Sequence, residues 1–517
     1  MSSVTKSSLP RSPSGNQREC DEFRRAPPLS RLSLSIFFFL GVALHVGIHL
    51  PFLFETELAE PDAGRLVLDA WMLATEGPGV LTGYRVRSSP AYLVAIAFLL
   101  KSGIASLAQI PGIMTFASLL SGALVMSMFV LLIGRWFNSV NALLVFWILM
   151  EASPVFWQAS IAGFPTIVSM AFFVGTMVFL DSLLFLASPA RRFIYAITAA
   201  ILFLLATLVK VDALALTPGL IGMVIYRAPR KVWVKSGLAI LVISAIVFVI
   251  GAFITQYYAA PQPSADFWQD WDSRWPMTFQ TLFSVSASGR FLCGAGLLMP
   301  LLGIGALTTM LRGEALSRRL AVFLLCWALP ATLFWMSRPG GARHFLTVYF
   351  PLAIAASWLF ASYPRSRKLW FGLGVLVVAN YFIWPPSADT LRPSGRLLAS
   401  THAYYRDAHT RHQLARQIAE ALKTGSICIH NLGEYTPYFL HEACALYYDQ
   451  PPKRLRSFEP APGITLPGGL SFSLSGDNNQ VLGYSYSPLK ETDVEALENA
   501  GIRVIGDIHE IEETSPR

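Results

Sequence analysis

A cluster of acidic residues directly follows the first apolar run of the chain. The stretch ETELAEPDAGRLVLDAW, residues 55–71, holds five carboxylates, and Asp62 follows Pro61 where a helix can begin. A carboxylate in the first turn of a helix lies near its positive pole and stays ionised unless burial raises its pKa. Such a group can serve as general base toward a hydroxyl or help to bind a divalent cation. Helix capping with solubilising charge is the simpler interpretation, and both stay open here.

The residues after Pro61 predict an amphipathic helix that lies along a membrane surface and ends at Gly77-Pro78. Apolar residues at helical spacing form one stripe, made of Ala63, Leu66, Val67, Ala70, Trp71 and Ala74. The opposite face is expected to carry the charged residues Asp62, Arg65, Asp69 and Glu76. This arrangement would present Asp62 at the depth of lipid headgroups.

Composition sets the class of protein. Hydrophobic residues make up 54% of the 517 residues and charged residues 14%, which is more apolar surface than a soluble chain can bury. We therefore expect an α-helical polytopic membrane protein. Residues 1–32 are rich in Ser, Pro and Arg without apolar periodicity, and they predict a disordered cytoplasmic tail. The net charge of +8 follows from this topology and needs no nucleic-acid partner.

Apolar runs of membrane-spanning length predict about eleven spans between residues 33 and 384. They cover 34–54, 112–134, 139–157, 165–187, 193–209, 212–226, 236–255, 291–311, 320–336, 345–362 and 369–384. Basic residues fall in alternate connections, which the positive-inside rule places in the cytoplasm with the tail. They are Arg135, Arg191, Arg192, Arg227, Arg230, Lys231, Lys235, Arg312, Arg318, Arg319, Arg365, Arg367 and Lys368.

The apolar segment 88–109 breaks this alternation if it crosses the membrane. We expect it to lie along the outer interface within an outer loop, residues 54–111. An ordinary helix packed in a hairpin is the alternative.

Residues 385–517 are more polar and predict a small extracytoplasmic α/β domain on the same side as Asp62. Helices are expected at HTRHQLARQIAEALKTG and KETDVEALENAG, with strands at SICIHN, CALYYD and IRVIGDIHEI. Cys428 and Cys444 begin successive strands. They could form a disulfide or pack as two thiols beneath a helix.

The stretch EPDAGRLVLDAWMLATEG resembles the first outer loop of the GT-C glycosyltransferases, which include the aminoarabinose transferases of lipid A and the protein O-mannosyltransferases. Those proteins carry Pro-Asp-Glu-x-x-Arg or a near variant. By this resemblance Asp62 takes the place of the catalytic Asp and Arg65 that of the Arg. Ala63 replaces a frequent second acid, which departs from the metal-binding form of the motif.

Four further segments resemble the same family in the same order. RSSPAYLVAIAFLLKSG resembles its juxtamembrane helix, with Arg87 close to a common Lys position, and SPVFWQASIAGFP resembles an outer helix junction, with Phe164 where many members have an Asp. LVKVDALALTPG places Lys210 in a Lys position, and GGARHFLTVYFPLAIAAS places Arg343 in an Arg position.

The resemblance implies an inverting glycosyltransferase that moves a hexose or pentose from a polyprenyl-phosphate donor to a glycan, lipid or protein acceptor outside a bacterial inner membrane. Asp62 would be the general base. The substrate-binding cations would be Arg65, Arg87, Lys210, Arg343 and His344, because phosphate is held by Arg forks and Lys point charges. The resemblance requires no cofactor, although a divalent metal is compatible with it. In the simpler interpretation Lys210 pairs with Asp212, and Arg343 anchors a loop at the headgroups.

Two other functions compete with this one. A lipid or glycan transporter or flippase would also have many spans, but such proteins place ionisable residues inside the membrane, and the predicted span interiors are almost free of them. A GT-C scaffold without activity is the second alternative, suggested by Ala63 and Phe164.

Overall fold

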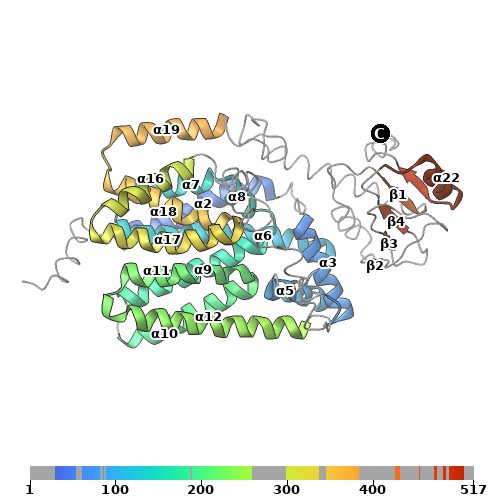
Figure 1. Cartoon of the computed structure of the whole chain (residues 1–517), viewed down its shortest axis with the longest axis horizontal. Helices are drawn as coiled ribbons and strands as arrows, with labels where there is room; N and C mark the ends of the chain where they lie inside the picture. Colours follow the sequence, from blue (N-terminus) through green and yellow to red (C-terminus); the bar gives the residue numbers. More distant parts are fainter. Residues whose placement is uncertain are drawn as a thin grey trace, which may run out of the picture.

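The computed structural model describes residues 30–53, 61–81, 86, 89–186, 189–258, 298–336, 345–382, 425–430, 453–454, 471–473, 481–484 and 488–505. The described residues up to 382 form a bundle of apolar helices, and the later described segments form a small sheet with one helix (Figure 1). Helices are the expected solution in a membrane, because each one satisfies its backbone hydrogen bonds within itself.

The bundle is built from fourteen α-helices among the described residues. They are α2 (Arg31–Leu53), α3 (Pro61–Glu76), α5 (Pro90–Lys101), α6 (Ile110–Phe137), α7 (Val140–Glu151), α8 (Pro154–Ala159), α9 (Pro165–Asp181), α10 (Pro189–Val209), α11 (Thr217–Arg227), α12 (Arg230–Tyr258), α16 (Leu298–Arg312), α17 (Ala315–Met336), α18 (Leu346–Ser362) and α19 (Arg367–Phe382). Short 3-10 turns precede α6 (η2, Leu107–Gln109) and α11 (η4, Val211–Leu216), and a π-helical turn follows α9 (η3, Ser182–Leu186).

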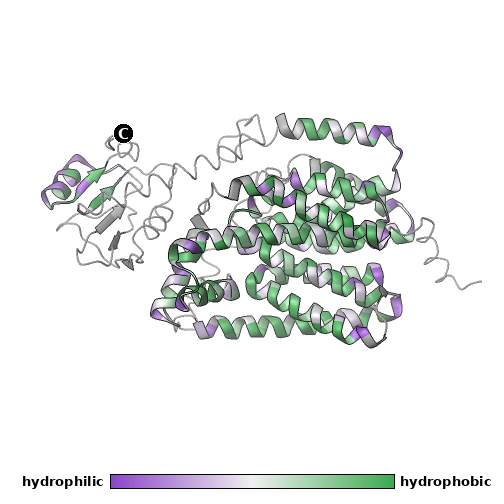
Figure 2. Ribbon diagram, turned by 180° about the vertical axis from the view of Figure 1, so that it is seen from behind, coloured by the Kyte–Doolittle hydropathy of each residue, from purple (hydrophilic) through white to green (hydrophobic). Residues whose placement is uncertain are grey.

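Six helices within these described ranges are long and apolar enough to cross a membrane. Their candidate spans are Leu32–Leu50, Ile110–Phe137, Pro165–Leu184, Arg191–Val209, Arg230–Tyr258 and Ala315–Met336. Apolar residues also cover the outward surface of the bundle (Figure 2). Val234, Phe253 and Phe371 are each at least 70% exposed, which suits contact with lipid chains rather than water. The predicted polytopic helical class is confirmed.

Two predicted spans are interrupted. The span at 139–157 divides into α7, of 12 residues, and α8, because Ser153 caps a new helix and Pro154 occupies its first position. The Ser153 hydroxyl accepts a hydrogen bond from the Phe156 amide. The span at 212–226 divides into η4 and α11, of 11 residues, with a proline again in the first turn of the second helix but without a side-chain cap. Hydropathy alone could not show these breaks, since the N-cap residues, Ser153 and Leu216, are uncharged.

Large aromatic side chains fill the centre of the bundle. Phe129 of α6 stacks with Phe350 of α18 at a centroid distance of 5.0 Å, and Trp327 of α17 meets Phe173 of α9 at 5.6 Å. These four side chains are fully buried. The core therefore ties α6, α9, α17 and α18 into one unit.

A group of buried polar contacts also joins the helices at the end of the bundle where α6 and α11 end. Asp181, fully buried at the end of α9, accepts hydrogen bonds from Arg227 Nε at 2.7 Å and from Trp136 Nε1 at 3.0 Å. Arg135 Nη1 lies 3.7 Å from the other Asp181 oxygen and also donates to the Ser182 hydroxyl. We call these residues the Asp181 network.

The last part of the chain contains five described strands: β1 (Ile427–Ile429), β2 (Lys453–Arg454), β3 (Ser471–Ser473), β4 (Val481–Tyr484) and β5 (Arg503–Ile505). Their order is β2-β3-β4-β1-β5, with β1 parallel to β4 and β5 and the other pairs antiparallel. The helix α22 (Glu491–Asn499) packs through Leu497 on Cys428.

Three elements predicted for this region agree with the structure: β1, β5 and α22. The predicted strand CALYYD and Cys444 lie outside the described residues. Cys428 is buried and carries a free thiol, so it forms no disulfide. The boundary at residue 385 and the extracytoplasmic location remain predictions.

Candidate functional site

The helix predicted after Pro61 is present. α3 begins at Pro61 and ends at Glu76, and Gly77 follows with φ at +85°, a left-handed conformation that favours glycine. Its buried side includes Ala63, Val67 and Ala70, as the apolar stripe predicted. Asp62 and Arg65 are on the first two turns of α3, but their side chains lie outside the described part of the structure.

The prediction for Asp69 was wrong. Its side chain is 2% exposed, although it was expected on the charged face with Asp62. Asp69 lies three residues after Leu66 and four before Leu73, so it shares their side of the helix. The inward face of α3 is therefore wider than the stripe suggested and includes an acidic residue.

α3 rests on an apolar layer that we call the outer cluster. It joins Val67 of α3 and Leu93 and Ile96 of α5 to Phe164 and to Val209 at the end of α10. α3 and α5 lie together at one end of the bundle, which we call the α3 end (Figure 1). The Gly79 amide, just after α3, donates to the Tyr258 carbonyl at the end of α12.

The segment predicted not to cross the membrane forms a short helix. α5 has 12 residues, or about 18 Å, against about 30 Å for the hydrocarbon core. Its Tyr92 hydroxyl donates to the Gly163 carbonyl at 3.1 Å, which joins α5 to the junction between α8 and α9. The length agrees with the interfacial interpretation.

Lys210 directly follows Val209, a member of the outer cluster. Its Nζ lies 3.5 Å from Asp212 Oδ2, and both side chains are partly exposed. The simpler interpretation, an ion pair at a helix end, is therefore confirmed for Lys210. Contact with a substrate phosphate stays a prediction.

Arg87, Arg343 and His344 lie outside the described residues. Their described neighbours are buried: Val86 belongs to the outer cluster, and Phe345 to the main core directly before α18.

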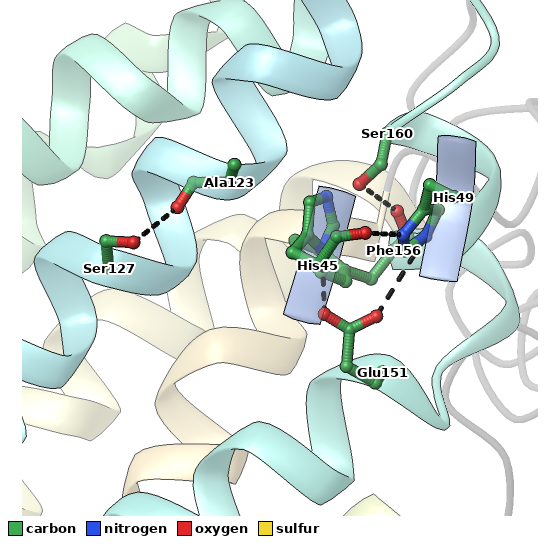
Figure 3. A network of polar contacts seen from close by, with 7 residues as sticks. All are labelled: His45, His49, Ala123, Ser127, Glu151, Phe156 and Ser160. Carbon is green, nitrogen blue, oxygen red and sulfur yellow. Dashed lines mark hydrogen bonds and ion pairs between the residues drawn. The ribbon is translucent and has the colours of Figure 1, made fainter. Parts of the chain in front are cut away.

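The structure also brings together three ionisable side chains that the sequence analysis did not select (Figure 3). His45 and His49 of α2 are fully buried and face Glu151, the last residue of α7, whose side chain is 8% exposed. His45 Nδ1 lies 2.7 Å from Glu151 Oε1, and His49 Nε2 lies 3.9 Å from Oε2. The expectation that span interiors are almost free of ionisable residues was therefore wrong.

A signal for this cluster was present in the sequence. His45 and His49 are four residues apart, which places both imidazoles on one face of a helix. An ionisable residue within a membrane span is a functional candidate by default, and the span at 139–157 contains Glu151.

Two solved structures share this arrangement of helices. The chain aligns with ArnT from Cupriavidus metallidurans bound to undecaprenyl phosphate at a TM-score of 0.54 and 16% identity, over 80% of this chain and 87% of that one. The apo state of the same ArnT gives a TM-score of 0.54 and 18% identity, over 78% and 84% of the two chains. The chain has the GT-C fold. The family resemblance in the sequence thus predicted the architecture correctly.

No protein-family model and no curated protein matches the chain. At these identities the similarity to ArnT concerns the GT-C fold, and the reaction is treated as a proposal below.

Proposed function

We propose that this protein is a membrane glycosyltransferase that takes a sugar from a polyprenyl-phosphate donor and uses Asp62 as its general base. The observation that carries the proposal is the GT-C fold shared with ArnT over most of both chains, in a structure of ArnT that binds undecaprenyl phosphate. Asp62 lies in the first turn of α3, at the position that the family motif assigns to the catalytic Asp. The sugar and the acceptor are left general.

In the proposed reaction the Asp62 carboxylate accepts the proton of an acceptor hydroxyl. The hydroxyl oxygen forms a bond to the anomeric carbon on the face opposite the phosphate, and the bond between that carbon and the phosphate oxygen breaks. Polyprenyl phosphate leaves with the bonding electron pair, and the sugar configuration inverts. Lys210, Arg343, Arg65, Arg87 and His344 are the proposed donors toward the phosphate charge.

The packing around α3 supports this role for Asp62. A base must be held near its target with little freedom, because correct positioning supplies a large part of such catalysis. Ala63, directly after Asp62, and Val67, one turn later, are buried in the outer cluster. Val209 in the same cluster brings the start of η4, and with it Lys210, to this layer.

The test is sugar transfer by the full chain purified into lipid nanodiscs. A panel of radiolabelled polyprenyl-phosphate sugars is offered with a membrane extract as acceptor. We expect Asp62→Asn to lower transfer by about 10²–10⁴-fold while donor binding remains, because a general base typically contributes that much. Glu76→Gln is the matched control, since Glu76 is an exposed acid at the other end of α3.

Equal transfer by the wild type and Asp62→Asn would remove Asp62 from the mechanism. Donor binding without transfer of any sugar would contradict the enzymatic function and favour a scaffold. Movement of intact donor across a vesicle membrane, unaffected by Asp62→Asn, would favour a flippase.

A further inference from the structure

The cluster of His45, His49 and Glu151 has the components of a metal site. One ligand atom from each residue can be chosen so that all three lie within 4.8 Å of one another. The two histidines come from adjacent turns of α2, and Glu151 comes from α7, more than one hundred residues later. The site is thus created by the packing of two helices.

A hydrogen bond determines which ring nitrogen of His49 carries the hydrogen and which one has a free lone pair. His49 Nδ1 lies 2.8 Å from the backbone carbonyl of His45, which can only accept, so Nδ1 carries the hydrogen. His49 Nε2 then presents its lone pair to Glu151 Oε2. Neither atom has a hydrogen-bond partner among the described residues, although both are buried. A cation between these two electron-rich atoms would satisfy both of them.

The distance between these two atoms selects the kind of cation. A proton joins nitrogen and oxygen only at about 2.7–3.2 Å, so the 3.9 Å separation is too long for a hydrogen bond. Two ligands that each lie about 2.0–2.2 Å from one tetrahedral zinc ion are about 3.3–3.6 Å apart, which is closer to the observed separation than a hydrogen bond is. His45 Nδ1, now 2.7 Å from Glu151 Oε1, would have to move away by about 0.6–0.9 Å to become the third ligand.

We propose that His45, His49 and Glu151 bind a transition-metal ion, best matched by Zn²⁺. Two imidazoles and a carboxylate are a ligand set typical of zinc, whereas Mg²⁺ and Ca²⁺ prefer oxygen ligands alone. Three protein ligands leave a fourth position for water. The proposal concerns residues other than Asp62 and does not rest on the proposed function.

The surroundings hold the imidazoles in place. A Cβ atom at Gly122 of α6 would lie only 2.6 Å from His45 Nε2 and 2.6 Å from the Ser160 hydroxyl oxygen, so the His45 ring requires glycine there. Phe156 and Trp157 lie against the rings of His45 and His49, with centroids 5.5 and 5.0 Å apart respectively. These contacts pack the rings in place, and the full burial of both histidines keeps bulk water away from them.

A bound ion would link the last turn of α2 to the end of α7. His49 lies four residues before Leu53, where α2 ends, and α3 begins eight residues beyond that. The ion would therefore fix the point from which the chain leaves the bundle toward α3. Its role is positional, since none of its ligands belongs to α3.

The test uses the full chain purified in detergent without a polyhistidine tag and freed of metal with a chelator. Co²⁺ is titrated in as a visible probe, because cobalt in a nitrogen and oxygen site of low coordination number absorbs visible light, and Zn²⁺ is then added as competitor. We expect one Co²⁺ per chain, displaced by Zn²⁺, and at least a tenfold weaker affinity in Glu151→Gln and in His49→Gln. Glu314→Gln, at an exposed acid before α17, is the control and should bind as the wild type does.

A wild type without a saturable cobalt spectrum would overturn the proposal, as would equal cobalt affinity in the wild type and Glu151→Gln. A second measurement needs no variant: Zn²⁺ should raise the Tm of the wild type in a concentration-dependent way, whereas Mg²⁺ should not. A Tm that is unchanged by Zn²⁺ would also overturn it.

Discussion

Asp181 and Glu151 are both buried between helices of the bundle, and their surroundings differ. Asp181 accepts hydrogen bonds from Arg227 and Trp136 and has a second guanidinium, that of Arg135, within 3.7 Å. Glu151 faces two imidazoles, and only one of them, that of His45, is within hydrogen-bond distance.

This difference indicates a structural role for Asp181 and a ligand-binding role for Glu151. Permanent cations already compensate the charge of Asp181, so its network can only hold α6, α9 and α11 together. Around Glu151 the compensation depends on histidines, whose charge is conditional, and both Glu151 Oε2 and His49 Nε2 are without a hydrogen-bond partner among the described residues. Asp181 Oδ2 also accepts no hydrogen bond there, but it lies 3.7 Å from the permanent charge of Arg135. An incomplete polar cluster such as the one at Glu151 is where a ligand is to be expected.

The largest expected effect comes from breaking the Asp181 network. Asp181→Asn leaves the buried Arg227 without its anion, and removing one partner of a buried pair costs about 3–5 kcal/mol. We expect a loss of this size in the free energy of unfolding, measured in mixed micelles. Asp212→Asn, which removes the partly exposed partner of Lys210, is the control. Similar losses in the two variants would contradict the assignment of Asp181 as a structural anchor.

Gly122→Ala should have a smaller but specific effect on the incomplete cluster. The added methyl must displace the His45 imidazole or the Ser160 hydroxyl, and overpacking of this kind costs about 1–3 kcal/mol. The variant should also lose the rise in Tm with Zn²⁺. Gly112→Ala, on the same helix with no atom near the new Cβ, should keep both properties. Retention of the Zn²⁺ effect in Gly122→Ala would show that the His45 ring is not held as described.

Glu151→Gln sharpens the comparison with Asp181→Asn. The amide keeps a hydrogen-bonding group next to His45 and leaves no arginine unpaired, so without metal we expect a loss of about 1 kcal/mol. With Zn²⁺ the gap to the wild type should widen, because only the wild type gains binding free energy. Thermal unfolding at increasing Zn²⁺ concentrations measures both values. A constant gap at every concentration would mean that Glu151 has a structural role only.

Lys210→Gln should change stability least among the charged variants. Partly exposed pairs such as Lys210 and Asp212 contribute about 0–1 kcal/mol. A large loss of sugar transfer with an unchanged Tm would therefore assign Lys210 to substrate binding. Equal transfer by Lys210→Gln and the wild type would leave it as a helix-end ion pair.

The last prediction concerns the buried thiol of Cys428 in the sheet. Burial in β1 raises the pKa of its thiol from 9.0 to about 12. Because the neutral thiol is favoured in the folded state, its contribution to stability is present below pH 9.0 and is lost as the pH rises toward 12. Iodoacetamide at pH 8.5 should label Cys428 slowly in the native protein and quickly in denaturant. Equal rates in the two states, followed by mass spectrometry of the Cys428 peptide, would contradict its burial.

Local patterns in the sequence predicted the elements at the α3 end well. Pro61, the apolar stripe and Gly77 define α3. The alternation of basic loops predicted that the segment of α5 does not cross the membrane, and the 12-residue length of α5 agrees with this prediction. The bounds of α3 depend on neighbours within a few residues. Family resemblance supplied the GT-C fold, which periodicity alone could not.

The errors arose where distant parts of the chain meet. Asp69 is buried because α3 packs inward over a wider face than its stripe suggested. The cluster at His45 depends on Glu151, which α7 brings in from elsewhere in the chain, so no local pattern contains it. The break at Ser153 is satisfied by a single hydroxyl and leaves no trace in hydropathy.

The shortness of α7 bears on how the protein enters the membrane. A helix of 12 residues extends about 18 Å, and its last residue, Glu151, is costly to expose to lipid. α2 and α6 can each cross the bilayer alone, whereas α7 needs partners to cover Glu151 and the turn before α8. We expect α7 to reach its final position in the membrane only after α2 and α6 have inserted. The short length of α7 and its terminal Glu151 would thus impose an order on helix insertion during synthesis.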